Sequence, residues 1–168
     1  MACVLSIMPV FGQSESKMNK IIADSKTAKA EFIAADGLMK GIFDLAYGYV
    51  IFPNVGKGGI GVGGAAGNGV VYEQKKVVGM AKLSQVSIGF QAGGQAYREV
   101  IFFESKNDLE RFKKSQLEFS AEVSAVAVTA GASANAKYAK GVMVFTMQKG
   151  GLMYEASVGG QKFKFNKM

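Results

Sequence analysis

Two stretches near the start of the chain carry apolar residues at helical spacing. Between Ser14 and Ile33, a mostly apolar face recurs every three or four residues, formed by Met18, Ile21, Ile22, Ser25, Ala28 and Phe32. This spacing predicts an amphipathic helix that ends at Asp36-Gly37. A second, shorter helix is predicted from Leu38 to Ala46. We expect both apolar faces to pack on the rest of the domain; contact with lipid or a partner is the alternative.

After Tyr47 the apolar pattern alternates with a period of two, which is typical of strands. The first strand spans Tyr49 to Asn54, and Pro53 is expected to stop it or to place it at a sheet edge. The dipeptide Asn68-Gly69 predicts a hairpin turn. The other strands expected here run over residues 60–66, 70–73, 77–83, 86–92 and 97–103.

A weak internal repeat is visible in these strands. Segments dense in small residues (GGIGVGGAAG, SIGFQAGGQA, AVAVTAGASANA) are each followed by a bulky one (GVVYE, REVIFFE, GVMVFTM). Such pairing lets two sheets or opposite barrel walls close tightly. Gly59, Gly61 and Gly64 also match the spacing of a dinucleotide-binding loop, but a helix must follow such a loop, and strand is predicted instead. We therefore interpret these glycines as packing positions.

One charged segment, Ser105 to Lys114, interrupts the strands and predicts a short helix with acids early and lysines late. Residues 117–130 fit helix or strand, and their β-branched alternation favours strand. Residues 153–165 alternate again. The predicted fold class is therefore α+β: two N-terminal helices packed on an antiparallel, Gly/Ala-rich β-sandwich or barrel-like sheet, with one short charged helix inserted.

Residues 1–12, MACVLSIMPVFG, are almost wholly apolar, yet far too few to span a bilayer. They fit the end of a secretory signal peptide cut ahead of Gln13, although no basic residue precedes the apolar run. A buried N-terminal element is the alternative. We predict a signal remnant over residues 1–12 and a single domain over residues 13–168, with Cys3 leaving the mature chain.

The composition argues against catalysis and against metal or cofactor binding. The chain has no His, no Trp and one Cys, which removes most metal ligands and the commonest general base. The carboxylates of Glu99, Glu104, Glu118 and Glu122 are interpreted as surface residues. We therefore predict a non-enzymatic protein with no catalytic residue, no metal site and no cofactor.

A formal net charge of +7 favours anionic partners. Nucleic acid is not expected, because interleaved basic and aromatic residues occur only at the C-terminus. A membrane surface fits better, with lysine clusters supplying attraction and aromatic rings supplying insertion. The candidate lipid contacts are Lys57, Lys75, Lys76, Lys113, Lys114, Lys162, Lys164, Phe163 and Phe165.

Four long runs carry a family resemblance. They are AYGYVIFPNVGKGGIGVGGA (Ala46–Ala65), SQVSIGFQAGGQAYREVIFFE (Ser84–Glu104), FSAEVSAVAVTAGA (Phe119–Ala132) and GVMVFTMQKGGLMYEASVGGQKF, and together they resemble the SYLF domain family. The resemblance implies a lipid-binding module: eukaryotic members bind phosphoinositides, and some bind or bundle actin. This chain resembles the stand-alone bacterial form, which often carries an export signal.

The resemblance and the residues together predict an exported bacterial protein, periplasmic or secreted, that binds anionic phospholipid at a membrane surface. The alternative is a structural scaffold that binds a protein partner, as actin-binding relatives do. Measuring binding at low and at high salt distinguishes the two hypotheses, because contact between lysines and anionic lipid weakens as the charges are screened.

Overall fold

The computed structural model describes residues 10–60, 62–88, 95–117, 119, 124–149 and 158–168 of the chain. Its elements, in chain order, are α1 (Val10–Ala35), α2 (Met39–Leu45), β1 (Gly48–Ile60), β2 (Val62–Glu73), β3 (Lys76–Ile88), β4 (Gln95–Phe103), α3 (Lys106–Lys113), β5 (Ala125–Ala127), the 3-10 helix η1 (Ala132–Asn135), β6 (Val142–Gln148) and β7 (Lys162–Lys167).

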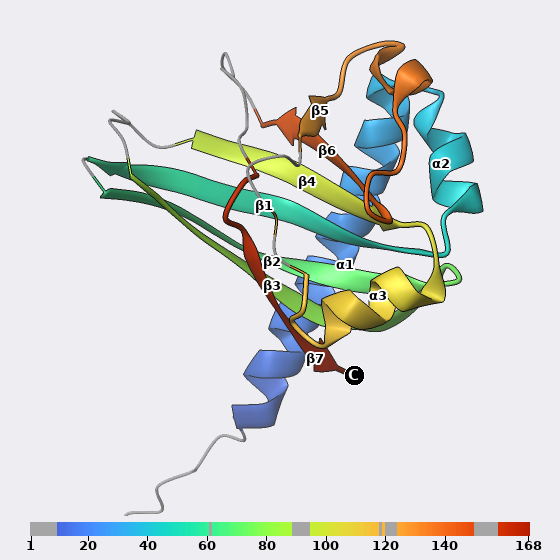
Figure 1. Ribbon diagram of the computed structural model, residues 1–168. Helices are drawn as coiled ribbons and strands as arrows, with labels where there is room; N and C mark the ends of the chain where they lie inside the picture. The colour runs from blue at the N-terminus through green and yellow to red at the C-terminus, as the bar shows by residue number, and fades with distance from the viewer. Residues whose placement is uncertain (1–9, 61, 89–94, 118, 120–123, 150–157) are drawn as a thin grey trace, which may run out of the picture.

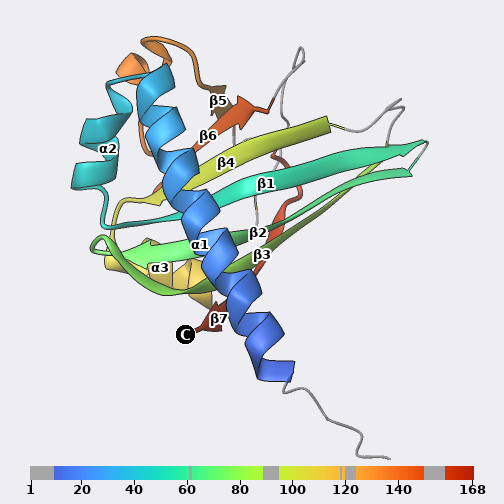
Figure 2. The same cartoon turned by 180° about the vertical axis from the view of Figure 1, so that it is seen from behind.

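The strands form one sheet in the order β5-β6-β4-β1-β2-β3-β7, and every neighbouring pair except β5 with β6 is antiparallel. The sheet is open, with β5 and β7 at its edges. Helices α1 and α2 lie on one face, which we call the helix side, and α3 lies on the other, the α3 side (Figure 1). Figure 2 shows α1 crossing the strands diagonally. The α+β class is confirmed, with a single open sheet in place of a sandwich or barrel.

Each face of the sheet carries its own apolar core, because side chains alternate between faces along a strand. On the helix side, Phe43 packs edge-on against Tyr49 and Phe102, with ring centroids 5.0 and 4.8 Å apart. On the α3 side, the Phe163 ring lies 5.2 Å from that of Phe112. The strand alternation predicted from the sequence therefore supplies two cores rather than one.

The prediction for Pro53 is wrong, because β1 runs through it and lies at the centre of the sheet. The pairing register of β1 shifts between Ile51 and Asn54 against β2, and between Phe52 and Val55 against β4. Proline has no N–H to donate to a ladder, and a bulge removes the need for one. The bulge therefore lets a proline occupy a central strand.

The predicted turn at Asn68-Gly69 is also wrong, since both residues lie inside β2. A Cβ at position 69 would lie 2.6 Å from a ring carbon of Phe52, so this glycine leaves room for that ring. The actual turn between β2 and β3 is Gln74-Lys75, where both residues have positive φ, 49° and 67°. Similarly, β3 continues through the predicted break between residues 83 and 86, and residues 89–92 of the second predicted strand lie outside the described part of the chain.

Helix α3 confirms the predicted charged helix. Ser105 caps it through a reciprocal capping box with Asp108, and Leu109 and Phe112 are fully buried. The predicted strand over residues 117–130 is observed only as β5, and residues 118 and 120–123 lie outside the described part of the chain. Of the C-terminal alternation, residues 153–157 also lie outside it, residues 158–161 are not strand, and residues 162–165 are confirmed as part of β7.

Helices α1 and α2 confirm the two predicted N-terminal helices. The predicted cleavage point before Gln13 falls within α1, residues 1–9 lie outside the described part, and export stays a prediction. None of the helices among the described residues has the length and apolar character needed to cross a membrane.

Asp36 ties the end of α1 to a distant loop. Its carboxylate accepts hydrogen bonds from the backbone N–H of Leu38 at 3.1 Å and from the N–H and hydroxyl of Ser133 at 2.8 and 2.5 Å. Asp36 is buried, and the hydroxyl of Ser133 is the main cause that holds the pKa of Asp36 below its ordinary value. The carboxylate thus stays ionised and joins α1 to η1.

We expect Asp36→Ala to lower the free energy of unfolding by about 2 kcal/mol, because buried donors lose their acceptor. This stabilisation requires the ionised carboxylate, so it is present above the ordinary pKa of 3.8 and is lost as pH falls through the lowered value. Urea denaturation at pH 7 and pH 3 measures both effects. Asp44→Ala is the control, because Asp44 forms an exposed pair with Lys40. Equal effects of the two substitutions would contradict the role of Asp36.

Candidate functional site

Three adjoining depressions form one groove between the N-terminal half of α1 and the helix side of the sheet. Their volumes are about 280, 210 and 280 Å³, and neighbouring depressions share lining residues. The charged lining consists of four lysines and one arginine against one aspartate. We call this feature the cationic groove; its polar lining is Lys17, Lys20, Asp24, Thr27, Asn54, Asn68, Lys82, Arg98, Lys149 and Asn166.

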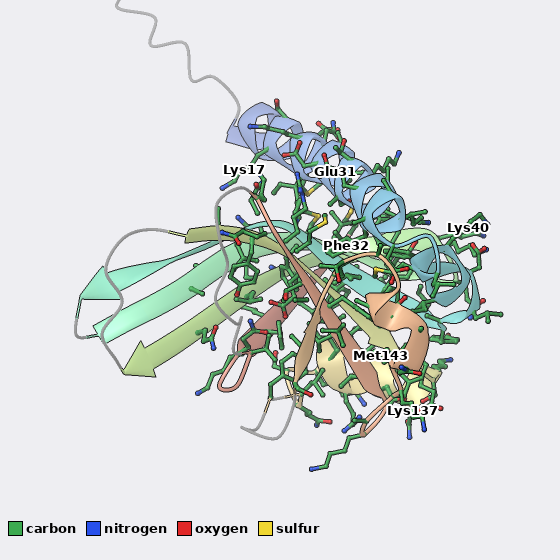
Figure 3. The ribbon with its side chains drawn as sticks, turned by 90° about the horizontal axis from the view of Figure 1, so that it is seen from above. Lys17, Glu31, Phe32, Lys40, Lys137 and Met143 are labelled. Carbon is green, nitrogen blue, oxygen red and sulfur yellow. The ribbon has the colours of Figure 1, made fainter. Side chains whose placement is uncertain are left out.

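The helical repeat places one wall of the groove. Lys17, Lys20, Asp24 and Thr27 follow each other at steps of three or four residues, so they share one stripe of α1. The adjacent stripe packs on the sheet through buried positions such as Phe32 (Figure 3). The polar stripe therefore runs along the edge of the helix contact and faces the open part of the sheet.

A row of residues paired across four neighbouring strands forms the floor of the groove. Asn54 of β1 pairs with Asn68 of β2, and Asn68 pairs with Lys82 of β3. Lys82 in turn pairs with Lys164 of β7, which completes the row. The bulge at Pro53 immediately precedes this row. Lys149, which follows β6, donates a hydrogen bond to the amide oxygen of Asn54. The floor thus offers amide groups at its centre and ammonium groups at its sides.

Arg98 lines the part of the groove next to β4 and forms an ion pair with Glu31 of α1, in which the guanidinium lies 2.5 Å from the carboxylate. This pair neutralises the guanidinium and joins β4 to the helix. The four lysines therefore supply the net positive charge of the groove. Ammonium and amide N–H groups are donors suited to phosphate or carboxylate oxygens.

The structure brings two of the sequence-predicted residues beside the groove. Lys162 and Lys164 are exposed on β7, opposite Ser84 and Lys82 of β3. Both project from the side of β7 that Phe163 does not occupy, as the predicted alternation requires. The cationic groove therefore continues across β7 to the edge of the sheet.

The other predicted lysines lie elsewhere. Lys75 and Lys76 are exposed at the turn between β2 and β3, where Lys75 pairs with Asp44 at 3.4 Å. Lys114 is exposed at the end of α3. Lys57 belongs to β1, and its side chain lies outside the described part. Lys75, Lys76 and Lys114 are therefore not part of the groove.

Lys113 has a structural role. Its ammonium lies 3.4 Å from the carboxylates of Glu73 and Glu110, and 5.7 Å from the centre of the Phe165 ring. The hydroxyl of Tyr47 donates to Glu73 at 2.8 Å and is the main cause that lowers the pKa of this carboxyl. The side chain of Lys113 thus joins α3 to β2 and β7.

The interpretation of Phe163 as a ring that inserts into lipid is corrected by its burial. Only 5% of Phe163 is exposed, and its ring packs against Phe52, Phe112 and Phe119. Phe165 is half-buried against the same core, and its ring fills the space above Gly79. The alternation of β7 was predicted correctly, but its apolar face belongs to the α3-side core.

The interpretation of Glu99 as a surface carboxylate is also wrong, because its side chain is fully buried. It lies on the α3 side of β4, between Tyr97 and Ile101, and accepts a hydrogen bond of 2.9 Å from the amide of Gln161. Burial raises the pKa of Glu99 to about 8. Among the described residues, no group of three or more Cys, Asp or Glu side chains is placed to hold a metal ion.

The sequence did not predict that five cationic residues would lie together in the groove. These residues are Lys17, Lys20, Lys82, Arg98 and Lys149. The helical spacing of Lys17 and Lys20 was visible in the sequence and could have indicated a shared face. Nothing local indicates that Lys82 or Lys149 lies near them. Their proximity follows from strand order.

Two comparisons with known proteins identify the family of this chain. The family model Ysc84, described as Las17-binding protein actin regulator, matches residues 84–168. Beta cell expansion factor A of Aeromonas veronii is 32% identical over 128 residues, which cover 75% of this chain and 48% of that protein. The chain thus spans about half the length of this curated relative. Because the family model covers half of the chain, the protein belongs to the Ysc84 (SYLF) family.

Proposed function

We propose that this protein binds anionic phospholipid at a membrane surface through the cationic groove and the adjoining lysines of β7. The observation that supports this most strongly is the cross-strand row that ends in Lys82 and Lys164, beside the Lys17 and Lys20 stripe of α1. Lipid phosphates present acceptor oxygens to these ammonium groups. Family membership supports a binding or regulatory role.

The energetics require several lysines to act together. Each lysine near an anionic surface contributes about 1 kcal/mol, so the four groove lysines and two on β7 supply roughly 6 kcal/mol. That corresponds to a dissociation constant between about 1 mM and 1 µM. Val86, which is 76% exposed and lies two residues beyond Ser84 on the same strand, offers an apolar contact beside the lysines. The proposed surface is therefore lysine-rich with a small apolar part.

Charge reversal of Lys17 and Lys20 tests this proposal. We expect the double variant Lys17→Glu and Lys20→Glu to bind vesicles of phosphatidylcholine and phosphatidylserine at least tenfold more weakly than the unmodified chain, because attraction becomes repulsion. Co-sedimentation at low salt measures the difference. Binding of the unmodified chain should also weaken as salt screens the charges.

The matched control is the double variant Lys26→Glu and Lys137→Glu. It makes the same change in net charge at two exposed lysines outside the lining of the groove. It should retain most of the binding. Equal loss in both double variants, or equal binding to pure phosphatidylcholine, would contradict a lipid site in the groove.

A protein partner is the second candidate, supported by the family description as an actin regulator. Co-sedimentation with filamentous actin, using the same two double variants, addresses it directly. Binding to actin that persists at high salt, without binding to vesicles, would replace the lipid proposal with this one.

We also propose that the protein acts by binding and without catalysis, and that it is exported. The support is the absence of His from the sequence and the apolar run at residues 1–12. N-terminal sequencing of the protein recovered from the periplasm or medium tests export. A start at Gln13 would agree with the predicted cleavage.

A further inference from the structure

A buried polar cluster lies within the apolar core of the α3 side. Glu99 and Gln161 are both fully buried, and Tyr97 and Gln85 are nearly so. The amide nitrogen of Gln161 donates to one carboxyl oxygen of Glu99 at 2.9 Å and lies 3.4 Å from the hydroxyl of Tyr97. Within the described part of the chain, the other carboxyl oxygen of Glu99 and the amide oxygen of Gln161 have no hydrogen-bond partner. These two buried acceptors thus have no donor among the described residues.

A proton on Glu99 would satisfy this cluster. A protonated carboxyl is both donor and acceptor, so it can accept from the amide nitrogen and supply the missing donor. An ionised Glu99 would instead be a buried charge with one hydrogen bond from the described residues, which is costly. The neutral form therefore matches the observed surroundings.

No opposite charge offsets the ionised form in the described part of the chain. The groups that face Glu99 are Tyr97 on its own strand, Thr146 opposite it on β6, and Gln161 before β7. Tyr97 is the titratable group among them, and its pKa is itself raised by burial, so it stays neutral. The charge state of Glu99 is thus governed by burial.

The cluster also holds the segment that leads into β7. Gln161 reaches Glu99, and the amide nitrogen of Gln85 on β3 donates to the carbonyl of Gly159 at 2.8 Å. Beyond this segment, β7 is an edge strand, and β3 is its one partner among the described strands. Any change that disrupts the Glu99–Gln161 contact therefore acts on an element with one strand neighbour.

We propose that the burial of Glu99 against Gln161 acts as a proton-dependent latch, which keeps β7 on the sheet while Glu99 is protonated and releases it when Glu99 ionises, because a carboxylate cannot be hydrated inside this core. Release hydrates the new carboxylate and exposes the ring of Phe163. It also removes Lys162 and Lys164 from beside Lys82. This last consequence rests on the proposed lipid-binding function, whereas the latch itself does not.

Hydrogen exchange of the full chain, followed from pH 5 to pH 9 and corrected for intrinsic rates, tests the latch. We expect the amides of β7 to be less protected than those of Val50 and Ile51 in β1. Protection of β7 should fall about tenfold per pH unit up to about pH 8 and then level off, because opening becomes linked to loss of one proton. In Glu99→Gln, protection of β7 should not change with pH.

A disulfide pin provides the matched control. Ser84 and Lys162 are direct cross-strand partners, so Ser84→Cys with Lys162→Cys, in a Cys3→Ser background, joins β7 to β3. In the oxidised pin, β7 should reach the protection of β1. Protection of β7 that does not change with pH, that equals β1 at every pH, or that keeps its slope in Glu99→Gln would overturn the latch. The comparison of β7 with β1 in the unmodified chain holds even if a variant fails to fold.

Discussion

Phe163→Ala should lower the free energy of unfolding by about 3–5 kcal/mol, the usual cost of removing a fully buried phenylalanine. The ring contacts Phe52 of β1, Phe112 of α3 and Phe119, so its loss leaves a cavity among three segments. Guanidinium denaturation followed by far-ultraviolet circular dichroism measures the change. The effect is expected to be among the largest in this chain because one side chain joins elements distant in sequence.

Lys164→Ala is the matched control for this prediction. It is the neighbouring residue on β7, and its side chain is exposed on the opposite face. We expect a change below about 0.5 kcal/mol in the free energy of unfolding, as for most surface substitutions. An equally small change in the free energy of unfolding for Phe163→Ala and Lys164→Ala would show that the ring is not held in the core. That result would contradict the burial of Phe163 and leave the ring free to contact lipid.

Glu99→Gln should raise the free energy of unfolding by about 3 kcal/mol at pH 7, even though it removes a charged residue. The pKa of Glu99 in the fold, about 8, lies above its ordinary value of 4.5. Folding therefore favours the protonated form, and stability falls as pH rises from 4.5 to about 8. Glutamine is neutral at every pH and has nearly the same shape, so it avoids this cost.

Chemical denaturation at pH 5, 6, 7 and 8 measures the effect. The unmodified chain should lose about 1 kcal/mol per pH unit across this range, and Glu99→Gln should lose little. The carboxyls with lowered pKa, such as Asp36 and Glu73, titrate below this range and act in the opposite direction. Glu104→Gln, at an exposed position, is the control. Parallel curves for the unmodified chain and Glu99→Gln would show that Glu99 is not buried in solution.

Local patterns predicted those elements whose signals lie within a few residues. The helical spacing of the N-terminal segment predicted α1, and the charge distribution from Ser105 to Lys114 predicted α3. The alternation of Lys162 to Phe165 predicted both strand and face for β7. These signals are reliable because periodicity and the interaction of charges with a helix dipole act between near neighbours.

Two other local sequence signals, for a turn and for a strand end, gave wrong predictions because strand pairing continues through both positions. Asn68-Gly69 has the preferred hairpin sequence, yet it lies within β2 because the ladder with β1 and β3 continues past it and Phe52 packs on Gly69. Pro53 occupies a central strand because a bulge accommodates its missing N–H. A strand ladder gains from every residue paired, so it outweighs the preference of one dipeptide.

By itself, the sequence determined the family, the α+β class and the positive charge, since these follow from residue order and composition. Only the tertiary structure decided which side chains meet. It brought Lys17 and Lys20 beside Lys82 and Lys164, and it buried Phe163 and Glu99 on the other face of the same sheet. The physical reason is that alternation specifies two faces of a strand, whereas strand order and the layers on each side determine which face is covered.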